Sequence, residues 1–283
     1  MKILVCDKLE EKVIDKFQEL GEITNISESK TKNEDLISNI VDTDIVVIRS
    51  GTKINKDILE NANNLKIIAR CGVGVDNVDV EEATNKKIYV TNSPNANIIS
   101  VAELTIGLII SAARKIHVSN NSLKDKKWDR GKFLGTELYQ KQLGLVGFGK
   151  AAKEVAKRLS AFGMNIVFYD PYVDSSTIKA KKVELDELLN TSDVISIHVV
   201  KTEETTNLIN NEKLDLIKKG GILVNTSRGG IIDEESLFQK ANEDFIFAGL
   251  DVFSQEPPDI NETFSKSNIV TTPHLGASTY EAQ

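Results

Sequence analysis

The chain has 283 residues, of which 40% are hydrophobic and 27% are charged. This length exceeds that of a typical single domain and favours two domains, each large enough to bury its own core. The formal net charge of -7 disfavours broad attraction to nucleic acid or to an anionic membrane surface, because the overall field repels both. We therefore expect any anionic substrate to be bound by a local cluster of Arg and Lys.

The two cysteines, Cys6 and Cys71, lack the spacing of metal ligands, so the sequence predicts neither a disulfide framework nor a metal site. The N-terminal run MKILVCD is strand-like and too short for a signal peptide. The longest apolar stretch, residues 104–113, is too short to span a bilayer. These features predict a cytoplasmic protein that is neither secreted nor inserted in a membrane.

Short β-rich apolar runs alternate with amphipathic helical segments along the chain, which is the pattern of parallel sheets covered by helices. Strands are predicted at residues 3–6, 22–26, 44–48, 66–69 and 88–90. After the turn Asn92-Ser93-Pro94 we predict one long helix over 97–118, followed by strands at 143–147, 165–169, 194–199, 221–225, 246–250 and 268–271. The predicted fold class is α/β with two doubly wound parallel-sheet domains, a smaller flavodoxin-like domain over 1–96 and a six-stranded Rossmann domain over 97–275.

A glycine-rich segment, Gly147-Phe148-Gly149-Lys150-Ala151-Ala152, matches the pattern G-x-G-x-x-A. It follows an apolar strand and begins a helical segment, and in this context the pattern indicates a dinucleotide-binding site. We expect Gly147 to permit a tight turn and Gly149 to let the backbone approach a pyrophosphate. Lys150 and Ala151 would meet this group at the helix N-terminus. The alternative is an ordinary turn between a strand and a helix.

Asp170 ends the next predicted strand, where an acid can accept hydrogen bonds from the ribose hydroxyls of a dinucleotide. No Arg follows it closely to receive a 2′-phosphate, so the sequence favours NAD over NADP. The alternative is a carboxylate that only starts the Asp-Pro turn.

Three further segments follow predicted strands of the second domain, at the sheet edge where open α/β folds bind ligands. They read NTSRGG, GLDVFSQEP and TPHLGAST, and they contain Arg228, Glu256 and His274. With these motifs the sequence resembles the D-isomer-specific 2-hydroxyacid dehydrogenases, from the first strand to the last residue. The resemblance implies that an Arg, a Glu and a His in this order act on a small 2-hydroxy acid with NAD.

The chemistry of such a reaction requires these residue types. Removal of the hydroxyl proton suits His274, since histidine exchanges protons reversibly near neutral pH. Glu256 on the other ring nitrogen would fix the tautomer, and Arg228 offers a planar donor fork for the substrate carboxylate and carbonyl. The alternative for each is a loop side chain with only local bonds.

Other residues near this edge receive expected roles from the same resemblance. It implies that Asp251 lies near the nicotinamide carboxamide, with a strand-end cap as the alternative. We expect His198 to be a packed residue at the cofactor edge without a catalytic role, and His117 to lie at a surface or interface of the long helix.

On the substrate side, residues 70–77 join a predicted strand to a helix, and Gly72, Val73 and Gly74 could expose backbone amides that bind a carboxylate. The resemblance implies that this loop holds the C1 carboxylate of the substrate. A simple turn is the alternative. Cys71 is expected to be a small loop residue that is sensitive to oxidation if it lines the site.

Within the family, residues 49–53, 95–97 and 126–133 look most like members that oxidise 3-phosphoglycerate. Arg49, Ser50 and Lys53 are therefore predicted to bind a substrate phosphate, and solvated basic residues are the alternative. A relative that reduces glyoxylate, hydroxypyruvate or another unphosphorylated 2-keto acid would share the same catalytic residues. A non-catalytic NAD-sensing protein on the same fold is the alternative from another class.

The resemblance also predicts a homodimer or higher homo-oligomer built around the long helix and the segment near Trp128. Residues 276–283 are expected to begin a segment that returns to the first domain.

Overall fold

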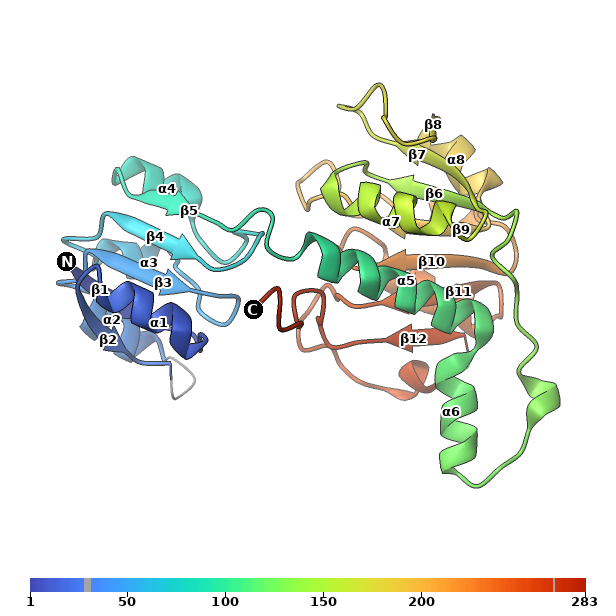
Figure 1. Ribbon diagram of the computed structural model, residues 1–283, viewed down its shortest axis with the longest axis horizontal. Coiled ribbons are helices and arrows are strands. Elements are labelled where there is room, and N and C mark those ends of the chain that lie inside the picture. The colour runs from blue at the N-terminus through green and yellow to red at the C-terminus, as the bar shows by residue number, and fades with distance from the viewer. Residues whose placement is uncertain (28–31, 267) are drawn as a thin grey trace. The chain divides into compact units, whose positions relative to one another are not determined.

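The computed structural model describes residues 1–27, 32–266 and 268–283 of the chain. These residues form two compact units, Met1–Asn97 with Ala277–Gln283, and Ile98–Gly276. Each unit is built around its own parallel β-sheet (Figure 1). The predicted fold class, α/β with two parallel-sheet domains, is confirmed.

The first unit contains a five-stranded sheet in the order β2-β1-β3-β4-β5, which is the flavodoxin-like order. Its strands are β1 (Lys2–Val5), β2 (Glu22–Asn25), β3 (Ile45–Ile48), β4 (Ile67–Arg70) and β5 (Tyr89–Thr91). Its helices are α1 (Glu11–Gln18), α2 (Asn33–Ile40), α3 (Lys56–Glu60) and α4 (Val80–Asn85). All four residues of β3 are buried, as expected for a central strand of a parallel sheet.

The second unit contains a seven-stranded sheet in the order β12-β11-β10-β9-β6-β7-β8. Its strands are β6 (Gln142–Val146), β7 (Asn165–Tyr169), β8 (Lys181–Lys182), β9 (Val194–Ile197), β10 (Gly221–Asn225), β11 (Ile246–Leu250) and β12 (Ile269–Thr271). Its helices are α5 (Ile98–Arg114), α6 (Ile116–Lys124), η1 (Arg130–Lys132), α7 (Lys150–Ser160), α8 (Leu185–Thr191), α9 (Asn211–Asp215), α10 (Glu234–Asn242) and η2 (Glu262–Ser265). The order reverses direction between β6 and β9, the position where doubly wound folds bind dinucleotides.

Two apolar layers cover the two faces of this sheet. Helices α5 and α7 pack together and bury Leu108, Val155 and Leu159 against one face (Figure 1). Helices α8, α9 and α10 bury another cluster, which includes Leu188 and Leu237, against the other face. The burial of both faces explains why the central strands read as continuous apolar runs, and it leaves the strand ends to carry polar residues.

The predicted single helix over 97–118 is wrong, because the chain breaks between α5 and α6 at Lys115. Lys115 has a φ of 52° and a ψ of 37°, so its backbone is left-handed and cannot continue the helix. The Lys115 ammonium lies 5.8 Å from the centroid of the Phe247 ring. The short strand β8, Lys181–Lys182, was also not predicted, and it makes the sheet seven-stranded rather than six-stranded.

Candidate active site

The glycine-rich turn joins β6 to α7 in the second unit. Gly147 has a φ of +88°, and a Cβ there would lie 2.8 Å from the backbone carbon of His198, so no larger residue fits. Gly149 is exposed and caps α7 without a side-chain hydrogen bond, and a Cβ there would meet no atom within 4 Å. Lys150 is exposed and Ala151 partly buried in the first turn of the helix. An accessible backbone at a helix N-terminus suits the pyrophosphate of NAD.

Asp170 follows β7 and lies beside this turn. Its Oδ2 accepts a hydrogen bond from the Phe148 amide at 2.8 Å, and its Oδ1 accepts from the amides of Tyr172 and Val173 at 2.8 and 3.2 Å. A carboxylate has about four acceptor positions. The three amide bonds therefore leave one position, on Oδ2, for a ribose hydroxyl. The carboxylate fits the predicted ribose role and also holds the glycine-rich turn in place.

His274 and Glu256 form a hydrogen-bonded pair at the carboxyl ends of β11 and β12. Nδ1 of His274 lies 2.6 Å from Oε2 of Glu256, and the two side chains are 45% and 37% exposed. The other carboxylate oxygen of Glu256 accepts a hydrogen bond from the Phe253 amide at 3.1 Å. With Nδ1 donating to a carboxylate, the neutral ring keeps an unprotonated Nε2. Such a nitrogen can accept the proton of an alcohol.

Asp251 holds the turn that carries His274. Its buried carboxylate accepts hydrogen bonds from the Thr272 hydroxyl at 2.6 Å, the Leu275 amide at 2.6 Å and the Gly276 amide at 2.9 Å. Its backbone carbonyl accepts from the His274 amide at 2.9 Å. Desolvation raises the pKa of Asp251, while these hydrogen bonds lower it. The bonds stabilise His274 at its φ of 54°, a left-handed conformation that is uncommon for residues other than glycine.

Arg228 lies on the loop that follows β10, in a partly buried position. The Asn225 side chain supports this loop, since its amide nitrogen donates to the Arg228 carbonyl at 2.8 Å and its oxygen accepts from the Ser227 amide at 3.0 Å. Nη1 of Arg228 donates to the Ser227 carbonyl at 2.7 Å. The structure thus places Arg228, Asp251 and the pair of His274 and Glu256 on neighbouring loops, at the carboxyl ends of three adjacent strands.

His198 follows β9, and its Nε2 lies 2.9 Å from the Ser196 hydroxyl. Desolvation lowers the pKa of His198 to about 4, so the ring is neutral near pH 7. A neutral, hydrogen-bonded ring is consistent with the predicted role of His198 as a packed residue. It is less suited to the role of a catalytic acid or base.

The low pKa of His198 predicts acid sensitivity. An unfolded chain binds a proton at His198 near pH 6.5, whereas the folded protein binds it only near pH 4, so stability is lost as pH falls from about 6.5 toward 4. We expect this residue to lower the free energy of unfolding by up to about 3 kcal/mol across that window. Urea denaturation at pH 7 and pH 5 measures about 2 kcal/mol of this loss. His198→Gln should reduce the difference between the two pH values. Equal differences in the wild type and in His198→Gln would contradict the assignment.

In the first unit, Asp7 and Asn77 hold the loop of residues 49–53. Oδ2 of Asp7 accepts from the amides of Arg49 at 2.5 Å and Thr52 at 3.2 Å, and the Asn77 amide group donates to the carbonyls of the same two residues at 2.7 and 2.5 Å. Nη1 of Arg49 donates to the Lys8 carbonyl at 3.2 Å. Ser50 and Lys53 are exposed. Asp7 and Asn77 were not predicted; the only sequence signal is that Asp7 directly follows a strand.

The neighbouring loop contains Gly72, Val73 and Gly74, which are partly buried. The Gly72 carbonyl accepts from the Ser93 amide and the Val73 carbonyl from the Asn92 side chain, both at 2.7 Å. These bonds fix the loop through its carbonyl groups. Burial raises the pKa of the Cys71 thiol in spite of nearby Arg49 and Arg70, which reduces its thiolate content near pH 7.

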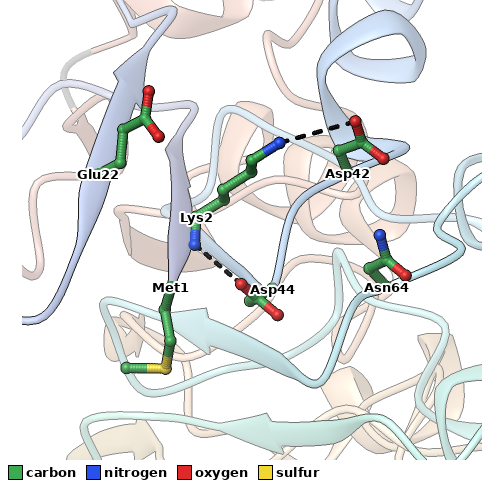
Figure 2. A pocket seen from close by; sticks show the side chains of 6 residues that line it. All are labelled: Met1, Lys2, Glu22, Asp42, Asp44 and Asn64. Atoms are coloured by element: carbon green, nitrogen blue, oxygen red, sulfur yellow. Dashed lines mark hydrogen bonds and ion pairs between the residues drawn. The ribbon is translucent and has the colours of Figure 1, made fainter.

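A separate pocket of about 380 Å³ lies in the first unit at the amino ends of β1, β2 and β3, away from the loops at their carboxyl ends (Figure 2). Its acidic side chains are partly neutralised: the Lys2 ammonium lies 3.7 Å from Asp42, and hydrogen bonds from Lys66 and from the Lys2 amide lower the pKa of Asp44. The pocket is at the amino ends of the strands, whereas open α/β folds bind ligands at the carboxyl ends. Its position and its acidic lining do not suit an anionic substrate. The lining residues are Met1, Lys2, Glu22, Asp42, Asp44 and Asn64.

Within residues 1–27, 32–266 and 268–283, no helix has the length and apolar character needed to cross a membrane. Within the same ranges, no group of three or more His, Cys, Asp or Glu side chains could hold a metal ion.

Comparison with known families places residues 106–276 in the family described as the NAD binding domain of D-isomer specific 2-hydroxyacid dehydrogenases. The chain is 48% identical over 288 aligned residues to the D-3-phosphoglycerate dehydrogenase of Methanocaldococcus jannaschii, covering 100% of this chain and 55% of that protein. It is 45% identical over 286 residues to the hydroxypyruvate reductase of Thermotoga maritima, covering 100% of this chain and 93% of that protein. The chain thus spans about half the length of the first relative and nearly all of the second.

The fold is also similar to that of solved structures. The TT0316 protein from Thermus thermophilus superposes with a TM-score of 0.93 at 33% sequence identity, covering 100% of this chain and 92% of that chain. The similarity includes both parallel-sheet units of this chain.

Proposed function

Because the chain belongs to the D-isomer specific 2-hydroxyacid dehydrogenase family, we propose that the protein oxidises D-3-phosphoglycerate to 3-phosphohydroxypyruvate with NAD. The observation that carries the dehydrogenase assignment is the 2.6 Å hydrogen bond between His274 and Glu256, on the unit that contains the NAD-binding domain. The choice of phosphoglycerate is supported by the identity of 48% to a protein of that name and by the loop that presents Arg49.

The proposed reaction moves a proton and a hydride from the same secondary alcohol. Nε2 of His274 accepts the hydroxyl proton as the C2 hydride leaves, and the Glu256 carboxylate stabilises the charged ring that forms. NAD held at the glycine-rich turn and by Asp170 would supply the acceptor for this hydride. The reverse reaction uses the protonated His274 as the acid.

Two groups orient the substrate in this proposal. The Arg228 guanidinium binds the carboxylate and the oxygen at C2, which develops carbonyl character. Backbone amides of the loop around Gly72, Val73 and Gly74 bind the C1 carboxylate. In this assignment the first unit is the substrate-binding domain.

A second candidate is a reductase of hydroxypyruvate or glyoxylate, favoured by the 45% identity to a hydroxypyruvate reductase of nearly the same length. A panel of 2-hydroxy and 2-keto acids, followed by NADH absorbance, distinguishes the two. Preference for the phosphoglycerate couple supports the proposal, and preference for glyoxylate or hydroxypyruvate selects the second candidate. Binding of NAD without turnover of any panel member would favour a non-catalytic NAD sensor.

Cofactor choice gives a separate prediction. A 2′-phosphate at the ribose would face the Asp170 carboxylate as a like charge, so we expect NADP to bind at least about 10-fold more weakly than NAD. Isothermal titration calorimetry with both cofactors measures the ratio. Asp170→Asn should reduce the preference for NAD over NADP, because the negative charge is removed. Equal affinities for NAD and NADP in the wild type would contradict this role of Asp170.

A further inference from the structure

The loop that carries Arg228 and the turn that carries Glu256 pack directly against each other. They follow β10 and β11, which are paired parallel neighbours. A Cβ on Gly229 would lie 1.8 Å from the carbonyl oxygen of Phe253 and 2.4 Å from the Ser254 amide nitrogen, so the two backbones approach as closely as only glycine allows. Any movement of one segment therefore affects the other.

Glu234 joins these two segments with its carboxylate. Oε1 accepts hydrogen bonds from the Ser254 amide at 2.6 Å and, more weakly, from the Gly230 amide at 3.4 Å. Oε2 accepts from the Ser254 hydroxyl at 2.9 Å. Bonds to an ionised acceptor are stronger than neutral ones, so the carboxylate ties Ser254 more firmly than a neutral group would.

The helix that carries Glu234 is well anchored. Glu234 is the first residue of α10, where the helix dipole favours a negative charge. Asp233 caps the helix by accepting from the Ser236 amide at 3.1 Å, and Leu237 and Ala241 are buried. The position of the Glu234 carboxylate is therefore set by a packed helix rather than by a loop.

We propose that Glu234 is a positioning residue that fixes the turn carrying Glu256 against the loop carrying Arg228, and so keeps the Glu256 carboxylate on Nδ1 of His274. Glu256 is only two residues beyond Ser254, which Glu234 holds. The charged groups near the His274 ring include Asp251 as well as Glu256. Asp251 is bonded to the turn of His274 and not to that of Ser254, so it cannot replace Glu234. The expected effect of Glu234 on kcat rests on the proposed function. Its effect on the hydrogen bond between Glu256 and His274 does not.

The tautomer of His274 tests the geometric part without any substrate. An isolated neutral imidazole prefers its proton on Nε2, and the Glu256 carboxylate holds it on Nδ1. The chain has three histidines, so the ring signals of His117, His198 and His274 can be assigned in two-dimensional proton–nitrogen spectra of the whole protein at alkaline pH. In Glu234→Ala we expect the population of His274 with the proton on Nε2 to rise clearly above that of the wild type.

Three variants serve as comparisons. Glu234→Gln retains an oxygen that accepts from the Ser254 amide, so it should change the His274 tautomer less than Glu234→Ala does. Glu235→Ala removes an exposed carboxylate from the same helix turn and should change nothing. Ser254→Ala removes only the hydroxyl bond and should give a smaller change in the same direction as Glu234→Ala.

Kinetics provide the second measurement. With whichever 2-hydroxy acid the wild type oxidises, Glu234→Ala should lower kcat by roughly 10-fold while the Kd for NADH stays within about twofold, since the glycine-rich turn is untouched. An unchanged tautomer in Glu234→Ala, or an equal change in Glu235→Ala, overturns the inference. If Glu234→Ala does not fold, Ser254→Ala tests the inference in its place. An unchanged His274 tautomer in Ser254→Ala then overturns the inference. A wild type that oxidises no 2-hydroxy acid contradicts the proposed function, and the tautomer experiment still tests this inference.

Discussion

Replacing His274 with alanine should lower kcat by about 100-fold or more, which is the usual scale for loss of general acid–base catalysis. The ring is the group whose Nε2 accepts the hydroxyl proton in the proposed reaction, and its Nδ1 is already bonded to Glu256 at 2.6 Å. The glycine-rich turn and Asp170 are on other loops, so the affinity for NAD should change little. Steady-state kinetics and calorimetry measure the two quantities separately.

Two companion variants make the result specific. His117→Ala removes a histidine from α6 and should leave kcat near the wild-type value. Glu256→Gln keeps the size of the side chain but not its charge, so the charged His274 ring loses its carboxylate partner and kcat should fall. Near-normal turnover in His274→Ala would contradict the assigned acid–base role, and a large loss of cofactor affinity would point to a structural effect instead.

Much of the fold could be predicted from the sequence because buried parallel strands leave a strong signal. The runs at Asn165–Tyr169, Gly221–Asn225 and Ile246–Leu250 agree with the predicted strands residue for residue. The helix break was missed because Lys115 lies in a stretch whose composition suits a helix on both sides. Its left-handed conformation is a property of the folded backbone, and lysine carries no local signal for it.

The candidate site could be predicted as a set of residues but not as an arrangement. Arg228, Glu256 and His274 stood out because they follow strands and match family motifs. The carboxylate bonds of Asp251 and Glu234 join backbone groups 20 to 25 residues away, and such bonds leave no periodic pattern. Asp251 shows the difference most clearly, since the resemblance suggested a contact with the cofactor and the structure adds bonds to the turn of His274.

Loss of substrate selectivity, rather than of chemistry, is expected from Arg49→Gln. A substrate phosphate contributes nothing to hydride transfer itself, but fixing it orients C2 and adds binding energy that is expressed in the transition state. A charge-assisted bond to Arg49 that is shielded from water is worth about 1.5 to 3 kcal/mol. The kcat/KM for 3-phosphoglycerate should therefore fall by about 10- to 150-fold.

The decisive comparison is between substrates, because the Arg49 backbone is held by Asp7 and Asn77 independently of its side chain. The glutamine variant should therefore retain the loop, and kcat/KM for an unphosphorylated 2-hydroxy acid should stay within about twofold. Lys86→Gln, which removes an exposed cation elsewhere in the same unit, controls for the change in net charge. If Arg49→Gln weakens both substrate classes equally, the side chain serves general binding, the phosphoglycerate assignment fails, and the broader dehydrogenase assignment remains.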